Sequence, residues 1–274
     1  MFSKLHNECI LEFNMETESP LFIKSGEENP LNPTATDSSY LALYKDGKFV
    51  PVIPGTSLKG IFRSRAESIL VGMNLYVCKI ISNIKESCGS KIKANLYDKK
   101  KSDGKEKYDK SCSVCKIFGS NILKSRIEFE DAYSEDDWII GKRKSVAIDR
   151  ISGAAIGGAF YDFEYVEYGN FKCRIKLKNF FNWHIKLIIM VLQDINEGFV
   201  TFGGCTSKGF GRMKVSNLKA KVRYYNKKSK GEYEDKGFYI QRIFEEDEIG
   251  KVIKNIKINE NIIKGCDIEN EHVL

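Results

Sequence analysis

The sequence lacks the features of a membrane-spanning or exported protein. It has no apolar run long enough to cross a bilayer, and its first residues, MFSKLHNECILEF, have neither the cationic lead nor the apolar core of a signal peptide. It contains only three histidines, His6, His184 and His272. These absences predict a cytoplasmic protein without a membrane partner, in which no pair of histidines is placed for acid–base catalysis.

What the sequence does contain is positive charge and cysteine. The 274 residues carry 44 Lys and Arg against 37 Asp and Glu, a formal net charge of +7. This excess favours a polyanionic partner, although many basic proteins bind none. Eight cysteines in a chain without an export signal indicate reduced thiols or metal ligands rather than disulfides.

Residues 51–65, PVIPGTSLKGIFRSR, are the most informative stretch. A Pro-Gly turn leads into a helix that Thr56 or Ser57 is expected to cap. Lys59 and Arg63 lie four residues apart near the start of this helix, where free N–H groups and the helix dipole favour an anion. The stretch predicts a phosphate site containing Ser57, Lys59 and Arg63. The alternative is an ordinary amphipathic helix with a solvated basic face.

The remaining segments predict a mixed fold. Asp46-Gly47 predicts a tight hairpin, and Gly169-Asn170 predicts a second turn. The order strand, helix, strand, strand, helix, strand predicts an α+β protein with a ferredoxin-like βαββαβ core, related to the sheet of RNA-recognition modules. Strands are predicted over residues 5–13, 126–132, 160–166, 171–177 and 208–218, and helices over 56–71 and 181–195.

Residues 73–120 differ from their surroundings and are interpreted as an insertion. Cys112 and Cys115 form a CxxC knuckle, and Cys78 and Cys88 can complete a tetrahedral thiolate site. Four protein ligands leave no open position, so the metal would be a structural zinc ion. The alternative is a set of free thiols. The lysine-rich residues 91–110 predict a solvated loop, and core thiols are expected at Cys9, Cys173 and Cys205.

A glycine-rich segment precedes the last predicted strand. Its backbone, free of side chains, can approach a polyanion closely while cations neutralise phosphates. The alternative is a pair of tight turns leading into that strand. The residues concerned are Gly203, Gly204, Gly209 and Gly211, with Lys208 and Arg212.

Four motifs together resemble one family. The strings IPGTSLKGIFR, CSVCKIFGS, DRISGAA and GGCTSKGFGRM occur in the order found in the RAMP superfamily of CRISPR systems. Over residues 5–215 the chain most resembles the backbone subunit of type III (Csm/Cmr-type) effector complexes, in the branch that carries a cysteine cluster. The resemblance implies a ferredoxin-like fold, a role in antiviral defence, and copies that coat a guide RNA together with other effector subunits.

The resemblance also implies roles for particular segments. The glycine-rich loop would lie against the guide RNA, and Gly203, Gly204, Lys208 and Arg212 are its candidate contacts. Residues 141–160 resemble the thumb hairpin, which wedges between guide and target. Ile151 would be the apolar wedge, and Arg150 would neutralise phosphate. The alternative for this segment is a solvent-exposed basic loop.

Asp37 is the candidate catalytic residue. In slicing members of the family, an aspartate in the loop after the first strand is required to cut target RNA, and Asp37-Ser38 resembles that motif. Here Ser39 replaces the family's following proline. One carboxylate would need Mg²⁺ or another divalent cation and the RNA itself to complete the site. The alternative is a loop aspartate that makes a local turn bond.

The sequence thus predicts one RAMP domain over residues 1–274, with a zinc-binding insertion at 73–120, a thumb at 141–160 and a C-terminal extension at 219–274 to which no function is assigned. The predicted function is a guide-RNA-binding subunit that cleaves complementary target RNA as a metal-dependent endoribonuclease. One alternative is a non-catalytic structural subunit of the same kind of complex. A remoter one is an RNA-binding module outside CRISPR defence. The scattered histidines argue against the guide-processing RAMP endonucleases that use such a residue.

Overall fold

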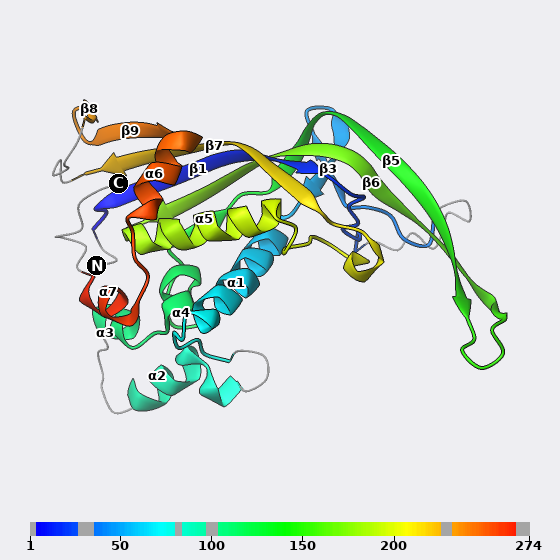
Figure 1. Cartoon of the computed structure of the whole chain (residues 1–274), viewed down its shortest axis with the longest axis horizontal. Coiled ribbons are helices and arrows are strands. Elements are labelled where there is room, and N and C mark those ends of the chain that lie inside the picture. The colour runs from blue at the N-terminus through cyan, green and yellow to red at the C-terminus, as the bar shows by residue number, and fades with distance from the viewer. Residues whose placement is uncertain (1–3, 27–35, 80–83, 97–103, 226–231, 267–274) are drawn as a thin grey trace.

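The computed structural model describes residues 4–26, 36–79, 84–96, 104–225 and 232–266. They form one large antiparallel sheet with helices packed beneath it (Figure 1). A long two-stranded arm extends beyond the body and contains residues 141–160, the predicted thumb segment. The strand order is β2-β3-β5-β6-β1-β7-β9-β8, and β4 also pairs with β6. No helix among the described residues is both long enough and apolar enough to cross a membrane.

Four long strands dominate the sheet: β1 (Asn7–Thr17), β5 (Ala132–Ile148), β6 (Ala155–Lys178) and β7 (Met213–Tyr224). β1 lies between β6 and β7 and runs antiparallel to both. The shorter strands are β2 (Ala42–Lys45), β3 (Lys48–Ile53), β4 (Ile127–Phe129), β8 (Glu234–Asp235) and β9 (Ile240–Glu245).

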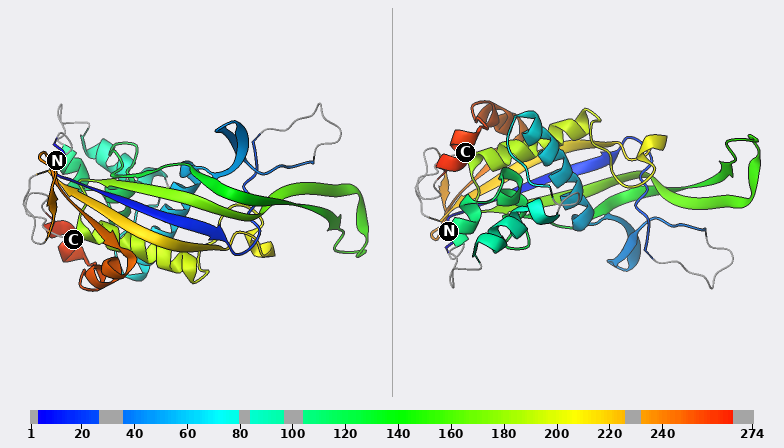
Figure 2. Two further views of the ribbon diagram at one scale, coloured as in Figure 1. Left: turned by 90° about the horizontal axis from the view of Figure 1, so that it is seen from above. Right: turned by 90° about the horizontal axis from the view of Figure 1, so that it is seen from below.

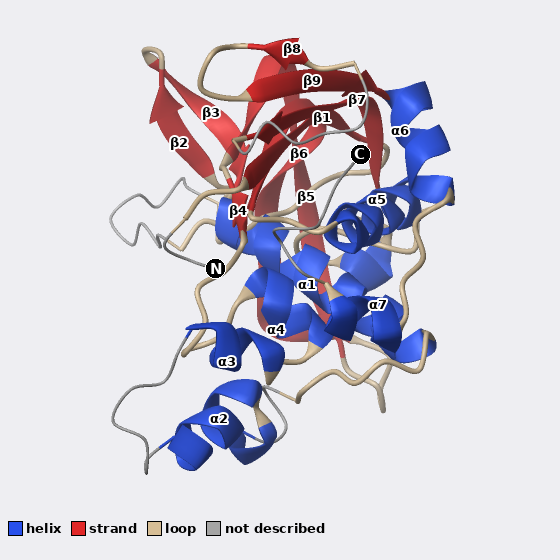
Figure 3. Ribbon diagram, turned by 90° about the vertical axis from the view of Figure 1, so that its left-hand side faces the viewer, coloured by secondary structure: helices blue, strands red, loops and turns tan. Residues whose placement is uncertain are grey.

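Alternation along β1 explains why one face of the sheet is buried. Cys9, Leu11, Phe13 and Met15 point into the core, and the residues between them lie on the opposite face. Helices α1 (Gly55–Gly72) and α5 (Asn182–Asn196) cover the apolar face (Figures 2 and 3). The smaller helices are α2 (Cys88–Leu96), α3 (Gly104–Asp109), α4 (Ser113–Phe118), α6 (Glu246–Lys254) and α7 (Glu260–Gly265), with 3-10 turns η1 (Ile84–Glu86) and η2 (Thr206–Lys208).

The α+β class is confirmed. The long strands run β5-β6-β1-β7, with α1 between β1 and β5 and α5 between β6 and β7 in the chain, which is compatible with the ferredoxin-like interpretation. The hairpin at Asp46-Gly47 is also confirmed, because both residues have positive φ and Lys45 pairs with Lys48.

Two sequence expectations about strands are wrong. Gly169-Asn170 is not a turn: β6 runs through it without a break, because β1 pairs with one edge of β6 and β5 with the other. The last long strand begins at Met213 rather than at Lys208, which lies in the turn η2. It then continues past Lys219 to Tyr224 and pairs with β9, so residues beyond 219 extend the same sheet.

Candidate metal centre and nucleic-acid interface

The four predicted cysteine ligands lie together. Cys78, Cys88, Cys112 and Cys115 are buried, and their sulfur atoms all lie within 4.8 Å of one another. Cys112 directly precedes α4, and Cys115 lies in the first turn of this helix. Cys88 is the first residue of α2. The Cys112 backbone N–H donates a hydrogen bond to Cys88 Sγ at 3.2 Å. The chain therefore has a compact set of four thiols able to bind one metal ion.

The geometry fits a tetrahedral ion. Zn–S bonds of about 2.3 Å require sulfur atoms roughly 3.8 Å apart. Cys78 Sγ and Cys115 Sγ are 3.6 Å apart. Hydrogen bonding between Cys112 and Cys115 lowers the pKa of the Cys112 thiol and raises the pKa of the Cys115 thiol. All eight cysteines are free thiols, and Cys9 and Cys173 are buried in the sheet as expected, whereas Cys205 is only half-buried.

Arg63 faces the cysteine cluster. Its Nη2 donates to Cys115 Sγ at 3.5 Å, its Nη1 donates to the Gly119 carbonyl oxygen at 3.2 Å, and its Nε bonds Glu67 at 3.0 Å. Lys59 lines the same cleft one turn earlier. Burial lowers the pKa of Lys59 and repulsion from Arg63 lowers it further, while Glu128 opposes the shift.

The start of α1 differs from the expectation. Pro54 rather than Thr56 or Ser57 precedes the first helical residue, and no side-chain cap is formed there. Instead the Gly55 N–H donates to Asp131 Oδ1 at 2.7 Å, from the segment between β4 and β5. A Cβ atom at Gly55 would approach the Phe129 carbonyl oxygen to 2.6 Å, so the close contact requires glycine. The chain's own carboxylate thus binds where an external anion was expected.

The glycine-rich loop packs against the segment after β1. The Gly204 N–H donates to the Phe22 carbonyl oxygen at 2.7 Å, and a Cβ at Gly203 would lie 2.3 Å from that oxygen. The close contact and the positive φ of 76° require glycine at position 203, whereas the hydrogen bond at position 204 does not depend on the side chain. Lys208 and Arg212 are exposed on the same loop, and Arg212 approaches Glu18 at 3.6 Å.

The arm ends in a turn built by one carboxylate. Asp149 Oδ1 accepts hydrogen bonds from the backbone N–H groups of Ile151 at 2.9 Å and Ser152 at 2.7 Å. These hydrogen bonds lower the pKa of the Asp149 carboxyl, and the bond from the Ser152 N–H has the largest effect. Arg150 is exposed and the Ile151 side chain is 98% exposed. The predicted wedge residue therefore projects into solvent at the tip of the arm.

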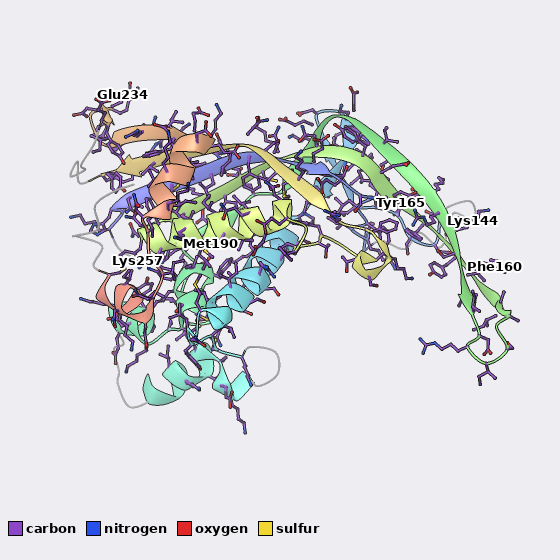
Figure 4. All side chains as sticks on the ribbon, in the orientation of Figure 1. Lys144, Phe160, Tyr165, Met190, Glu234 and Lys257 are labelled. Carbon is purple, nitrogen blue, oxygen red and sulfur yellow. The ribbon has the colours of Figure 1, made fainter. Side chains whose placement is uncertain are left out.

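An aromatic cluster anchors the base of the arm. The rings of Phe163 and Tyr165 on β6 pack against Phe210 of the glycine-rich loop, with centroid distances of 5.9 and 5.2 Å. The Arg143 guanidinium lies 4.9 Å from the Phe210 ring. Along the arm, Tyr165 lies near the body, and Lys144 and Phe160 lie farther out (Figure 4). The arm base and the glycine-rich loop thus form one packed unit.

Asp37 lies beside this unit and pairs with a carboxylate that the sequence did not reveal. The Asp37 N–H donates to Asp162 Oδ1 at 3.0 Å, and the Asp162 N–H donates to Asp37 Oδ2 at 3.0 Å. The next residue, Ser38, forms a bridge with Phe163 of the aromatic cluster. Asp162 is one polar residue in an alternating strand, so no local signal distinguished it. Residues 27–35 of the predicted loop lie outside the described residues.

The predicted site residues therefore separate into two groups. Asp37, the arm and the glycine-rich loop are joined through Ser38, Phe163 and Phe210. Arg63 and Lys59 instead line the cleft at the cysteine cluster. Ser57 is half-buried in the first turn of α1.

The solvent face of the central strands carries ion pairs between neighbouring strands. Lys176 on β6 lies 3.3 Å from Glu8 on β1, and Arg174 lies 3.3 Å from Glu12. Lys219 on β7 lies 3.1 Å from Glu245 on β9. These charges partly neutralise one another, so this face resembles a solvated surface more than a stacking platform for bases.

An antiparallel sheet covered by helices on one face, a four-cysteine cluster able to hold a metal ion and a projecting hairpin define this α+β protein. The family model of the RAMP superfamily matches residues 14–214, from β1 to the start of β7. The chain therefore belongs to the RAMP superfamily, and membership supports an RNA-binding subunit associated with CRISPR systems. Among curated proteins, none matches the sequence with significance.

Proposed function

We propose that the protein is a backbone subunit of a type III CRISPR effector complex, in which copies bind along a guide RNA with other subunits and cleave complementary target RNA. The observation that carries this proposal is the contact of Asp37 with Asp162 at the base of the arm, next to the glycine-rich loop. This contact lies between the arm and the glycine-rich loop, the two segments that are proposed to bind RNA.

Guide binding is assigned to exposed cations around the arm and loop. Lys208 and Arg212 on the loop and Arg150 on the arm are exposed and are proposed to contact phosphates. Such contacts are independent of base sequence, as a subunit that coats any guide requires. Ile151, held in solvent by the Asp149 turn, is proposed to insert between guide and target bases.

Asp37 and Asp162 are the proposed residues for a catalytic divalent cation. Mg²⁺ binds through one or two carboxylates and completes its shell with waters and substrate phosphates. The reciprocal bonds use Asp162 Oδ1 and Asp37 Oδ2, and the second oxygen of each carboxylate is the proposed ligand. When bound, the cation would neutralise charge on the phosphate.

The proposed reaction depends on positioning of the target. The arm would distort the strand so that a 2′-hydroxyl aligns with its adjacent phosphorus. Attack forms a 2′,3′-cyclic phosphate and breaks the bond to the 5′-oxygen. Water takes the 2′ proton and supplies one to the leaving oxygen. The exposed Asp37 is proposed to help hold the cation that would neutralise the scissile phosphate.

Zinc is the proposed occupant of the cysteine cluster. Four cysteine thiolates close the coordination sphere of a tetrahedral ion, so the metal would brace the module rather than take part in cleavage.

A non-catalytic structural subunit is the second candidate. The observation that favours it is that the Asp37 carboxylate already accepts the Asp162 N–H, which is a structural role for a loop aspartate. The two candidates share the fold and the RNA-binding surface and differ only in what Asp37 does.

Two substitutions separate the candidates. Asn at position 37 keeps an oxygen that can accept the Asp162 N–H but removes the negative charge, whereas Ala removes both. The assembled complex with Mg²⁺ is given an end-labelled RNA complementary to its guide. Wild type, Asp37→Asn and Asp37→Ala are compared for cleavage products and for guide occupancy.

Catalysis at Asp37 predicts a ladder of evenly spaced products from the wild type and none from either variant, with guide occupancy unchanged. Cleavage retained in Asp37→Asn but weakened in Asp37→Ala would identify a structural role for the residue. A wild-type complex that binds target without cutting it would favour the non-catalytic subunit.

A further inference from the structure

Arg63 connects helix α1 to the cysteine cluster. Its guanidinium reaches two parts of the knuckle, Cys115 Sγ at 3.5 Å and the Gly119 carbonyl oxygen at 3.2 Å. Gly119 has a positive φ of 82° and directly follows α4, so this carbonyl lies at the end of the helix that carries Cys115. One planar group thereby joins the first turn of α4 and the residue that follows this helix to α1.

The charge of the centre explains why a cation is useful there. A zinc ion with four thiolates carries a net charge of about −2, and these sulfur atoms are buried. A buried negative charge without compensation is costly, and a permanently charged guanidinium that donates to one sulfur reduces this cost. Glu67 bonds the third guanidinium nitrogen at 3.0 Å and helps to hold the side chain in place.

We propose that Arg63 is a positioning residue of the four-cysteine metal centre, which neutralises part of the thiolate charge and locks the knuckle against α1. The proposal rests on the assignment of a metal to this cluster under the proposed function. Arg63 would then act on metal affinity rather than on guide-RNA phosphates. Partners of this kind outside the ligand set commonly change metal affinity by about 10- to 100-fold.

The chain offers a matched control on the same helix. Arg65 also forms an ion pair, with Asp194 Oδ2 at 2.6 Å, and stacks over Phe199, but it belongs to neither predicted site. Arg65→Gln therefore removes the same charge from the same helix without touching the cysteine cluster. Arg63→Lys keeps the charge but loses the planar fork.

The test uses the full-length chain and two metals. Zinc affinity is measured by competition with a chromophoric chelator, and Co²⁺ replaces zinc to give thiolate-to-metal charge-transfer bands. We expect Arg63→Gln to weaken zinc binding about 10- to 100-fold and to shift the Co²⁺ bands. Arg63→Lys should weaken zinc binding less, and Arg65→Gln should match the wild type in both measurements. Thermal unfolding at saturating zinc checks that each variant is folded.

Three results would overturn the proposal. Unchanged zinc affinity and Co²⁺ bands in Arg63→Gln would show that the contact has no effect on the metal. Equal losses in Arg63→Gln and Arg65→Gln would indicate a general effect of charge on α1. A wild-type chain that binds neither zinc nor Co²⁺ would remove the metal assignment itself, and this failure is visible before any variant is compared.

Discussion

The two parts that leave the body of the sheet are held by different kinds of interaction. The cysteine module is a set of short helices gathered around four buried sulfur atoms, with α2 only nine residues long and α4 only six. The arm is two long strands held by backbone pairing, and its tip is solvent-exposed. A metal can brace the module, whose helix α4 also packs into the main core through Val114, Ile117 and Phe118. The arm depends instead on its aromatic anchor and on strand hydrogen bonds.

This difference suits the proposed roles. Short helices are marginal in water without tertiary support, so a metal crosslink would add to the core packing that holds the module in shape. An arm that inserts between two RNA strands needs exposed residues at its tip, such as Ile151, and little else there. If a metal controls the module alone and the aromatic anchor controls the arm alone, a change in one part should leave the other part unaltered.

The largest effect is expected from removal of a cluster thiolate. Cys115→Ser should abolish stoichiometric zinc binding and lower the free energy of unfolding by more than ~3 kcal/mol, because structural zinc supplies about 10–16 kcal/mol in small zinc-binding peptides. Metal analysis and denaturant unfolding measure this. Cys205→Ser, outside the cluster, serves as the control and should retain its metal. Equal stability of Cys115→Ser and Cys205→Ser would contradict a metal-held module.

Chelation should affect the module without affecting the arm. After removal of the metal, limited proteolysis should cut first within residues 75–120, because their short helices lose the crosslink. The arm, residues 141–160, should be cut at the same rate with and without chelator. Faster cleavage of both parts after chelation would mean that the metal supports the whole fold. It would contradict the view that the module and the arm are held by different interactions.

A smaller effect is expected at the base of the arm. A Cβ at Gly141 would lie 2.6 Å from the Tyr165 ring, so Gly141→Ala must displace a ring of the aromatic anchor. Overpacking of this kind costs about 1–3 kcal/mol, and zinc affinity should not change. Gly157→Ala, where no atom lies within 4 Å of the added carbon, is the control and should be near neutral. A neutral Gly141→Ala would show that the anchor adapts freely.

The smallest effect on stability is expected at the tip. Ile151→Ala should change the free energy of unfolding by less than ~0.5 kcal/mol, since its side chain is almost fully exposed. Under the proposed function it should nevertheless reduce target cleavage by the assembled complex. Ile148→Ala, which changes an exposed residue of the same arm away from the tip turn, is the comparison. If Ile151→Ala lowered stability without reducing cleavage, the role of Ile151 would be to stabilise the fold rather than to contact RNA.

Local sequence patterns predicted much of the fold. The spacing of apolar residues gave α1 and α5 to within about one residue, because a helix reports its buried face within a few turns. The hairpin at Asp46-Gly47 followed from turn chemistry alone. The cysteine cluster was also predicted, since a CxxC pair has few structural uses and two more cysteines lay nearby.

The tertiary structure decided which distant groups meet. Asp162 meets Asp37 across 125 positions of sequence, and Arg63 meets Cys115 across 52. Sheet register sets the first contact, and the rotation of α1 about its axis sets the second. Neither quantity is encoded in a local pattern. For the same reason the carboxylate of Asp131 at the start of α1, and the unbroken course of β6 through Gly169, appear only once the strands are paired.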